Sequence, residues 1–228
     1  MSDRAYRSGM SRVPAMGSER LLLVLAGCFF VFHHAPSLAG NAGDWIDLAT
    51  PFAVVAATAA VLCSLPTARA ATVLALIGGL LYVDGHGIHL AANSIGHETL
   101  SGDAKSVTHF WDETFGHIEW HLGWMTLIAA IALAEAYSQE TRTWRPRSYP
   151  IAVATAALLG FTLFTGTVEG GTWWLELAAA VVFLVWTLRA PRPLLVTCAG
   201  AFALAAALIG VWAIWHGGVP QFSQLGWL

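Results

Sequence analysis

Apolar stretches long enough to cross a lipid bilayer recur along almost the whole chain, and they constrain its fold more than any other feature. A membrane-spanning helix needs about 20 consecutive, mainly apolar residues. Seven such stretches are expected to form helices, at about 19–38, 45–64, 70–93, 109–137, 149–168, 172–189 and 194–216. Only 11% of the 228 residues are charged, about half the share of a soluble domain. The sequence therefore predicts an all-α, polytopic integral membrane protein with about seven transmembrane helices.

Positive charge alternates from one connecting segment to the next. Arginines lie before the first stretch, between the second and third, between the fourth and fifth, and between the sixth and seventh, whereas the remaining segments contain only Lys105. Because basic residues are retained on the cytoplasmic side, we predict a cytoplasmic N-terminus and an extracytoplasmic C-terminus. The chain is expected to form one transmembrane domain, 1–228, with a cytoplasmic tail at 1–18 and an extracytoplasmic tail at 217–228. We expect it in a bacterial inner or plasma membrane.

The first apolar stretch has a second interpretation as a secretory signal peptide. Ser37, Leu38 and Ala39 form a candidate cleavage site, and Cys28 ends a short segment similar to a lipoprotein box. The apolar run continues past Cys28, so we expect an uncleaved first span. Cleavage would leave six spans in the same orientation.

All nine histidines are expected on the side of the membrane opposite to the arginines. They are His33 and His34 at the end of the first stretch, His86, His89 and His97 at the end of the third, His109, His117 and His121 at the start of the fourth, and His216 at the end of the seventh. Histidine is rare at membrane depth unless it binds a metal, a cofactor or protons. The pattern therefore predicts a functional site near the outer leaflet.

The spacing of these side chains indicates a metal site. His86 and His89 fall on one helical face of the third stretch, and Glu113, His117 and His121 follow one another at intervals of four on the next. Consecutive antiparallel helices can bring these two faces together. Imidazole suits zinc, copper and iron, and a carboxylate adds an oxygen ligand or a general base. We predict the four histidines as ligands and Glu113 as base or further ligand.

Other polar residues receive more varied interpretations. Asp84 is a candidate catalytic group. The candidates to hold a ligating imidazole are Asp84, Asp112, Glu113 and Glu119. Glu169, at the end of the fifth stretch, is a further candidate ligand. Asp47 is interpreted as a carboxylate at a helix N-terminus. His33, His34, His97, His109 and His216 are interpreted as residues of the membrane interface or of helix ends. Glycines at 78, 79, 85 and 87 allow close contact between helices.

The histidine pattern is similar to those of three families of membrane metal enzymes, and it departs from each. Membrane desaturases and hydroxylases carry HxxxH and two HxxHH motifs, whereas this chain has one HxxxH, at His117 and His121, and no HxxHH. Zinc hydrolases related to alkaline ceramidases use an Asp and His residues that Asp84 and His89 resemble, but their HxxxH lies near the C-terminus. Copper subunits of the particulate methane monooxygenase type use DxxxHxxxH, where this chain has Glu113. These similarities concern site chemistry and assign no family.

The sequence favours a membrane-embedded metalloenzyme that acts on a lipid or other apolar substrate. A divalent transition metal is expected: zinc in a hydrolase, or copper or iron in an oxidoreductase. The alternatives are a metal-ion or proton transporter, a haem b electron-transfer protein with paired axial histidines, and an interaction protein whose histidines only bind metal. The chain has no glycine-rich phosphate-binding loop after a strand, so we expect no nucleic-acid partner. The sequence leaves the oligomeric state open.

Overall fold

A computed structural model describes residues 17–38, 42–66, 68–96, 101–138 and 146–227, and within these ranges the chain is helical, with no strand. The elements, in chain order, are α1 (Ser18–Leu38), α2 (Gly43–Cys63), α3 (Arg69–Gly96), α4 (Gly102–His109), the π-helix η2 (Phe110–Gly116), α5 (His117–Ala136), α6 (Ser148–Glu169), α7 (Trp173–Arg189), α8 (Pro193–His216) and the short 3-10 helix η3 (Ser223–Leu225). Helices occupy all seven predicted ranges. The fourth range, 109–137, consists of η2 and α5, and α4 precedes it.

Five of the described helices are long and apolar enough to cross a membrane: α1, α2, α3, α6 and α8. The other two long helices, α5 and α7, do not meet that description, each for its own reason. Helix α7 has only 17 residues, fewer than the roughly 20 that a bilayer requires. Helix α5 carries His117, Glu119, His121 and Glu135 among its 20 residues. The fold therefore fits a multi-pass membrane protein with five candidate spans, and the number seven stays a prediction.

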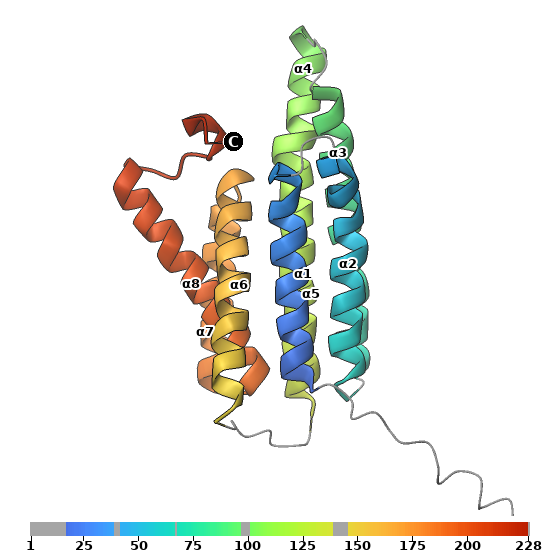
Figure 1. Cartoon of the computed structure of the whole chain (residues 1–228), viewed down its shortest axis with the longest axis vertical. Helices are drawn as coiled ribbons and strands as arrows, with labels where there is room; N and C mark the ends of the chain where they lie inside the picture. Colours follow the sequence, from blue (N-terminus) through green and yellow to red (C-terminus); the bar gives the residue numbers. More distant parts are fainter. Residues whose placement is uncertain (1–16, 39–41, 67, 97–100, 139–145, 228) are drawn as a thin grey trace, which may run out of the picture.

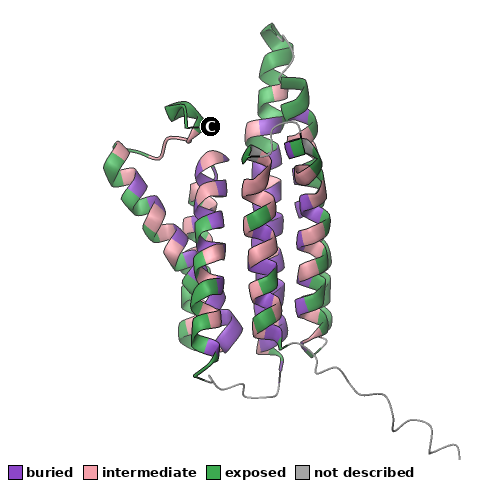
Figure 2. Ribbon diagram, viewed as in Figure 1, coloured by how far each residue is buried: buried purple, intermediate pink, exposed green. Residues whose placement is uncertain are grey.

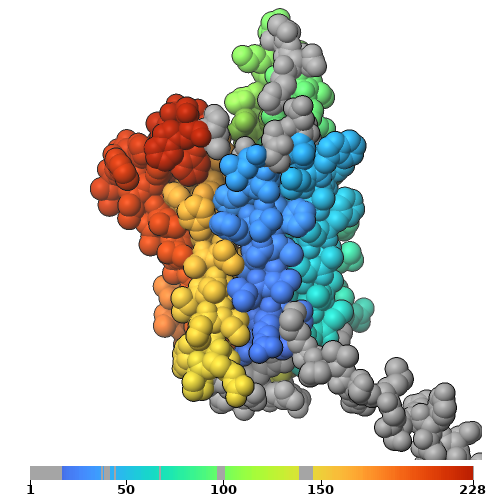
Figure 3. Space-filling view, viewed as in Figure 1, coloured from blue at the N-terminus to red at the C-terminus, as the bar shows by residue number. Residues whose placement is uncertain are grey.

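Helix α5 lies inside the bundle. It packs along α3 and also contacts α2, α7 and α8, while α1 lies between α2 and α6, and α8 packs on α6 and α7 (Figures 1 and 3). Most of α5 is buried from its first turn to its last, and the purple segments in Figure 2 mark this interior. The perimeter is apolar instead. Exposed side chains there include Val73, Leu76, Ile77 and Leu80 on α3, and Val181, Val182, Leu184 and Leu188 on α7. Such faces suit contact with lipid.

Glycines bring α3 and α5 together at backbone distance. A Cβ atom on Gly85 or on Gly123 would overlap the backbone of the facing helix, at Trp120 and Tyr82 respectively. Gly78 on α3 approaches the Leu127 backbone in the same way, where a Cβ would lie 2.9 Å from its nitrogen. Small residues allow this close approach between membrane helices. The contact fixes how the polar residues of α3 stand against those of α5.

A buried carboxylate anchors the opposite end of the bundle. Glu135, near the end of α5, is 1% exposed, and its two carboxylate oxygens accept hydrogen bonds from the backbone N–H groups of Leu194 and Leu195, each at 3.0 Å. These groups belong to the first turn of α8, whose N–H groups have no partner within the helix. Glu135 is therefore a cap that joins α5 to α8.

Candidate metal centre

Three imidazoles form a row at one end of the bundle, called here the histidine end, which is uppermost in Figure 1. The ring of His89, from α3, lies 4.5 Å from the ring of His117 on α5, and His117 lies 6.0 Å from His121, measured between ring centroids. With metal–nitrogen distances of about 2.1 Å, two imidazoles on one ion have centroids roughly 5–6 Å apart. The observed spacings lie close to this range. The side chains of His117 and His121 are buried and that of His89 is nearly so.

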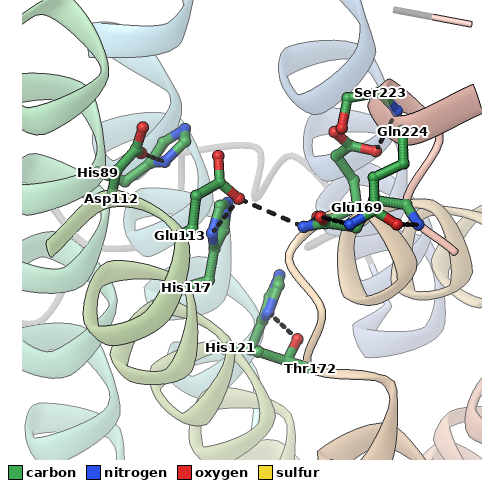
Figure 4. Close-up of polar contacts among 10 residues, drawn as sticks. His89, Asp112, Glu113, His117, His121, Glu169, Thr172, Ser223 and Gln224 are labelled. Atoms are coloured by element: carbon green, nitrogen blue, oxygen red, sulfur yellow. Dashed lines mark hydrogen bonds and ion pairs between the residues drawn. The ribbon is translucent and has the colours of Figure 1, made fainter. Parts of the chain in front are cut away.

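Each of the three rings has one nitrogen against an oxygen atom (Figure 4). Nδ1 of His89 lies 2.7 Å from a carboxylate oxygen of Asp112, and Nδ1 of His117 lies 3.9 Å from a carboxylate oxygen of Glu113. Nδ1 of His121 shares a hydrogen bond of 2.5 Å with the hydroxyl of Thr172. Nδ1 is therefore the nitrogen next to an oxygen atom in each ring. Among the described residues this contact is a hydrogen bond for His121, and an ion-pair distance without a hydrogen bond for His89 and His117.

A π-helical segment places the two carboxylates. Residues 110–116 form η2, with hydrogen bonds from each residue to the fifth one along, directly before α5. In an α-helix, Asp112 would be out of register with His117 and His121. The wider π turn instead places Asp112 one turn from His117, on the side that faces His89 of α3. Segments of this kind are rare and occur often at functional sites.

A pocket of about 370 Å³ opens beside the row of imidazoles. Its lining consists of His109, Glu113, Thr114, Ile118, Gly170, Gly171, Thr172, Trp174, Val219, Gln221 and Gln224. Two of these residues, Glu113 and Thr172, also hold His117 and His121, so the pocket adjoins the candidate ligands. Its volume lies within the usual range for small-molecule sites, about 300–1,000 Å³. Most of its lining side chains are polar.

The C-terminal segment, residues 217–227, forms one wall of this pocket. The side-chain amide of Gln221 donates hydrogen bonds to a carboxylate oxygen of Glu113, at 3.3 Å, and to the backbone carbonyl of Glu169. The carboxylate of Glu169 accepts a hydrogen bond of 3.1 Å from the backbone N–H of Ser223. Glu169 therefore binds the C-terminal segment, and within the described part of the chain it contacts no imidazole.

The electrostatic setting of Glu113 suits a base. Glu113 lies in η2, outside the five spans, and is partly buried. Burial raises the pKa of its carboxyl above the ordinary value, and the adjacent Asp112 carboxylate raises this pKa further. The hydrogen bond from Gln221 lowers it in part. A glutamate with a raised pKa is better able to take up a proton near neutral pH.

His86 stands apart from the row. Its ring is fully buried, and Nε2 lies 2.9 Å from the backbone carbonyl oxygen of Asp47 and 3.2 Å from the carboxylate of the same residue. Trp120 packs edge-on against this ring, with centroids 4.7 Å apart. Asp47, interpreted from the sequence as a helix N-terminal carboxylate, is thus also a partner of His86. The predicted ligand His86 is thus engaged with α2 through Nε2, while its ring lies 6.4 Å from that of His89, measured between centroids.

The remaining predicted site residues lie in several places. Asp84 is exposed on α3 and lines a second pocket with Glu119 of α5, so the structure does not bring it to the imidazoles. His109 lines the first pocket. His216 packs against the ring of Trp212, with centroids 4.1 Å apart. His97 lies outside the described residues.

Sequence reasoning missed three residues that hold the site. These residues come from segments that are far from α3 and α5 in the chain: Thr172, Gln221 and Asp47, the partner of His86. Thr172 stands at the N-cap of α7, where a threonine side chain often caps the helix. Its hydroxyl instead forms a hydrogen bond with His121. The sequence could have indicated this contact only through the position of Thr172, at the start of a helix on the side of the membrane where the histidines were expected.

The residue types of this site suit a transition metal, but their donor atoms do not converge on a single position. Buried imidazoles held by oxygen atoms at one nitrogen are the usual arrangement of metal-binding histidines. In the part of the chain that the structure describes, Nδ1 of His86, of His89 and of His117 is buried without a hydrogen-bond partner. Among the described residues, however, no three His, Cys, Asp or Glu side chains have donor atoms already spaced to hold an ion. Metal binding would require the imidazoles to rotate toward one another.

Comparison with known proteins yields no relative. No protein family matches the chain, and no curated protein or solved structure shows significant similarity to it.

Proposed function

We propose that this protein is a membrane metalloenzyme whose ligands are His89, His117 and His121. The observation that supports the proposal is the shared arrangement of these three rings, since each has Nδ1 against an oxygen atom from a different position. Three imidazoles of this kind resemble, in residue type, the three-histidine sets of catalytic zinc sites, which leave one position for water. Asp112, Glu113 and Thr172 would fix the orientation of the rings. The predicted ligand His86 would support the centre from its contact with Asp47.

The reaction that this arrangement favours is hydrolysis. When bound, a zinc ion would act as a Lewis acid and lower the pKa of a water molecule in its coordination shell to about 7. Glu113 lies between His117 and the pocket, where its carboxylate can accept a proton from a nucleophile and return it to a leaving group. Gln221 orients this carboxylate. Copper or iron in the same set of imidazoles would instead indicate oxidation.

The substrate would place a polar group in the pocket. The pocket is small, and threonine hydroxyls, glutamine amides and a carboxylate line it. The exposed perimeter of the bundle is apolar, so a substrate can reach this end through the bilayer. We therefore favour the polar head of a lipid or of another amphiphile.

The proposed topology has seven spans, with the histidine end outside the cytoplasm. Arg69, Arg147, Arg189 and Arg192 lie toward the end of the bundle opposite to the histidines, next to the ends of α3, α6, α7 and α8. Retention of arginine on the cytoplasmic side supports this orientation. A transport pathway has less support, because the carboxylate of Glu135, the main acidic residue of the opposite half, is engaged in capping α8.

Elemental analysis and an absorption spectrum of the detergent-purified protein test the proposal. The wild type should contain about one metal ion per chain, and the double variant His117→Ala/His121→Ala should contain none while still inserting into the membrane. His216→Ala is the matched control, because this histidine packs among aromatic rings away from the row. Zinc would support hydrolysis, copper or iron would support oxidation, and a Soret band would indicate haem. A double variant with full metal content would refute the site.

A further inference from the structure

His33, on α1, lies at the same end of the bundle as the three proposed ligands. Its ring packs against Trp120 of α5, with centroids 5.8 Å apart, and against Phe29 one turn earlier on α1, at 5.7 Å. Trp120 also contacts the rings of His89, His117 and His121. Trp120 is therefore surrounded by the imidazoles of α1, α3 and α5, and His33 belongs to the same cluster of rings.

Gly166 of α6 and Gly170, the C-cap of this helix, leave room for these rings. A Cβ atom on Gly166 would lie 3.3 Å from Nε2 of His33 and 3.4 Å from Nε2 of His121, so both nitrogens border the same small space. One turn later, a Cβ atom on Gly170 would lie 2.9 Å from ring carbons of both His117 and His121. Side chains larger than hydrogen at these two positions would occupy the space into which the rings of α1 and α5 point.

The adjacent His34 gives a direct contrast. Nδ1 of His34 lies 2.7 Å from the backbone carbonyl oxygen of Phe30, and Nε2 lies 3.0 Å from the hydroxyl of Thr165. Both ring nitrogens of His34 are thus engaged in contacts within and between α1 and α6. His34 has the role of a bridge between two helices, whereas His33 presents a nitrogen beside that of His121.

We infer that His33 is a further imidazole ligand of the proposed metal centre, which binds a borderline transition metal through histidines of α1, α3 and α5. The inference rests on the proposed function, and it adds a ligand from the first helix that the sequence pattern of α3 and α5 does not contain. Nε2 of His33 and Nε2 of His121 both border the space over Gly166. Zinc, copper and cobalt all accept such nitrogen-rich sets.

A Co²⁺ titration of the metal-stripped, full-length protein in detergent tests this inference. Visible absorption reports how many ligands surround the ion, and it gives an affinity in the absence of any substrate. Loss of an outer partner of a ligand weakens metal binding about 10–100-fold, so loss of a ligand should do at least as much. We expect His33→Ala to weaken Co²⁺ binding by about 100-fold or more and to change the absorption spectrum. His34→Ala should remain within about threefold of wild type, since it removes only a helix-to-helix bridge.

Gly166→Ala provides a second variant that keeps every imidazole. The added methyl group would occupy the space that Nε2 of His33 and Nε2 of His121 share, so Co²⁺ affinity should again fall by about tenfold or more. This variant decides the question if His33→Ala does not fold, as judged by circular dichroism.

The outcomes separate this inference from the proposed function. If wild type binds Co²⁺ and His117→Ala/His121→Ala does not, while His33→Ala and Gly166→Ala bind as His34→Ala does, then His33 is no ligand and the metal centre stands. If wild type binds neither Co²⁺ nor Zn²⁺, the metal centre and the role of His33 are both refuted.

Discussion

Replacement of Gly85 by alanine should separate α3 from α5 and disturb the histidine row. A Cβ atom at this position would overlap the backbone nitrogen of Trp120 and lie 2.9 Å from the carbonyl oxygen of Gly116, whereas an ordinary contact begins at 3.4 Å. The two helices would have to move apart by about 0.5 Å or more, which matches the tolerance of a metal or catalytic site. Overpacking of this kind costs about 1–3 kcal/mol. The contact of His89 with His117 lies directly beside this point.

Thermal unfolding and Co²⁺ titration of the purified protein provide the assay. For a chain of this size, 1–3 kcal/mol corresponds to a fall in Tm of roughly 2–12 °C. Co²⁺ affinity should fall together with Tm. Gly87→Ala is the matched control, because nothing lies within 4 Å of the added Cβ, and alanine favours a helix by up to about 1 kcal/mol over glycine. Equal Tm values and affinities for the two variants would refute the packing argument.

Three further predictions concern carboxylates and the C-terminal segment. Glu135→Gln replaces a carboxylate oxygen that accepts a hydrogen bond from a backbone N–H of α8 by an amide NH₂ group. A hydrogen bond to a charged group is worth about 1.5–3 kcal/mol, so the Tm of the variant should be lower than that of the wild type. An unchanged Tm would argue against the cap. Burial raises the pKa of Glu113 above 4.5, so folding favours its neutral form, and the metal-free protein should lose this stabilisation as pH rises from 4.5 through the raised pKa. Glu113→Gln should lack that part of the pH dependence, and parallel plots of Tm against pH for the two proteins would contradict the shift. Gln221→Ala removes the hydrogen bonds to Glu113 and Glu169, so proteolysis should become faster within residues 217–227 but not within the helices. Limited digestion followed by mass spectrometry would measure these rates. Identical rates for the variant and the wild type would show that these bonds do not hold the segment.

The positions of the helices could be predicted because bilayer thickness imposes a minimum apolar length. The structure has helices in all seven predicted ranges, and five of these helices are long and apolar enough to cross a membrane. The glycines were recognised as points of close contact, but the sequence did not separate Gly78 and Gly85 from Gly79 and Gly87. The first two face α5 at backbone distance, whereas nothing lies within 4 Å of a Cβ on the other two. That distinction depends on which face of α3 meets α5.

The candidate site could be predicted only where its residues follow helical spacing. His117 and His121 are one α-helical turn apart, and His89 lies on the facing helix, so periodicity brings them together. The position of Asp112 depends on a π turn, for which the sequence has no clear signal. Thr172 reaches His121 from the connection between α6 and α7, and only the packing of these helices against α5 brings the two together. Asp84 carries the right chemistry but lies on the outer face of α3.

The position of Trp120 makes it a natural optical reporter. Rings of His33, His86, His89, His117 and His121 all have centroids within 5.9 Å of it. Copper or cobalt held by these imidazoles would quench indole emission at such short range, whereas zinc, with its filled d shell, would leave most of it. The difference in emission between the wild type and Trp120→Phe would isolate this one indole from the other ten in the chain. Emission during titration could thus distinguish a quenching ion from zinc without any knowledge of the substrate.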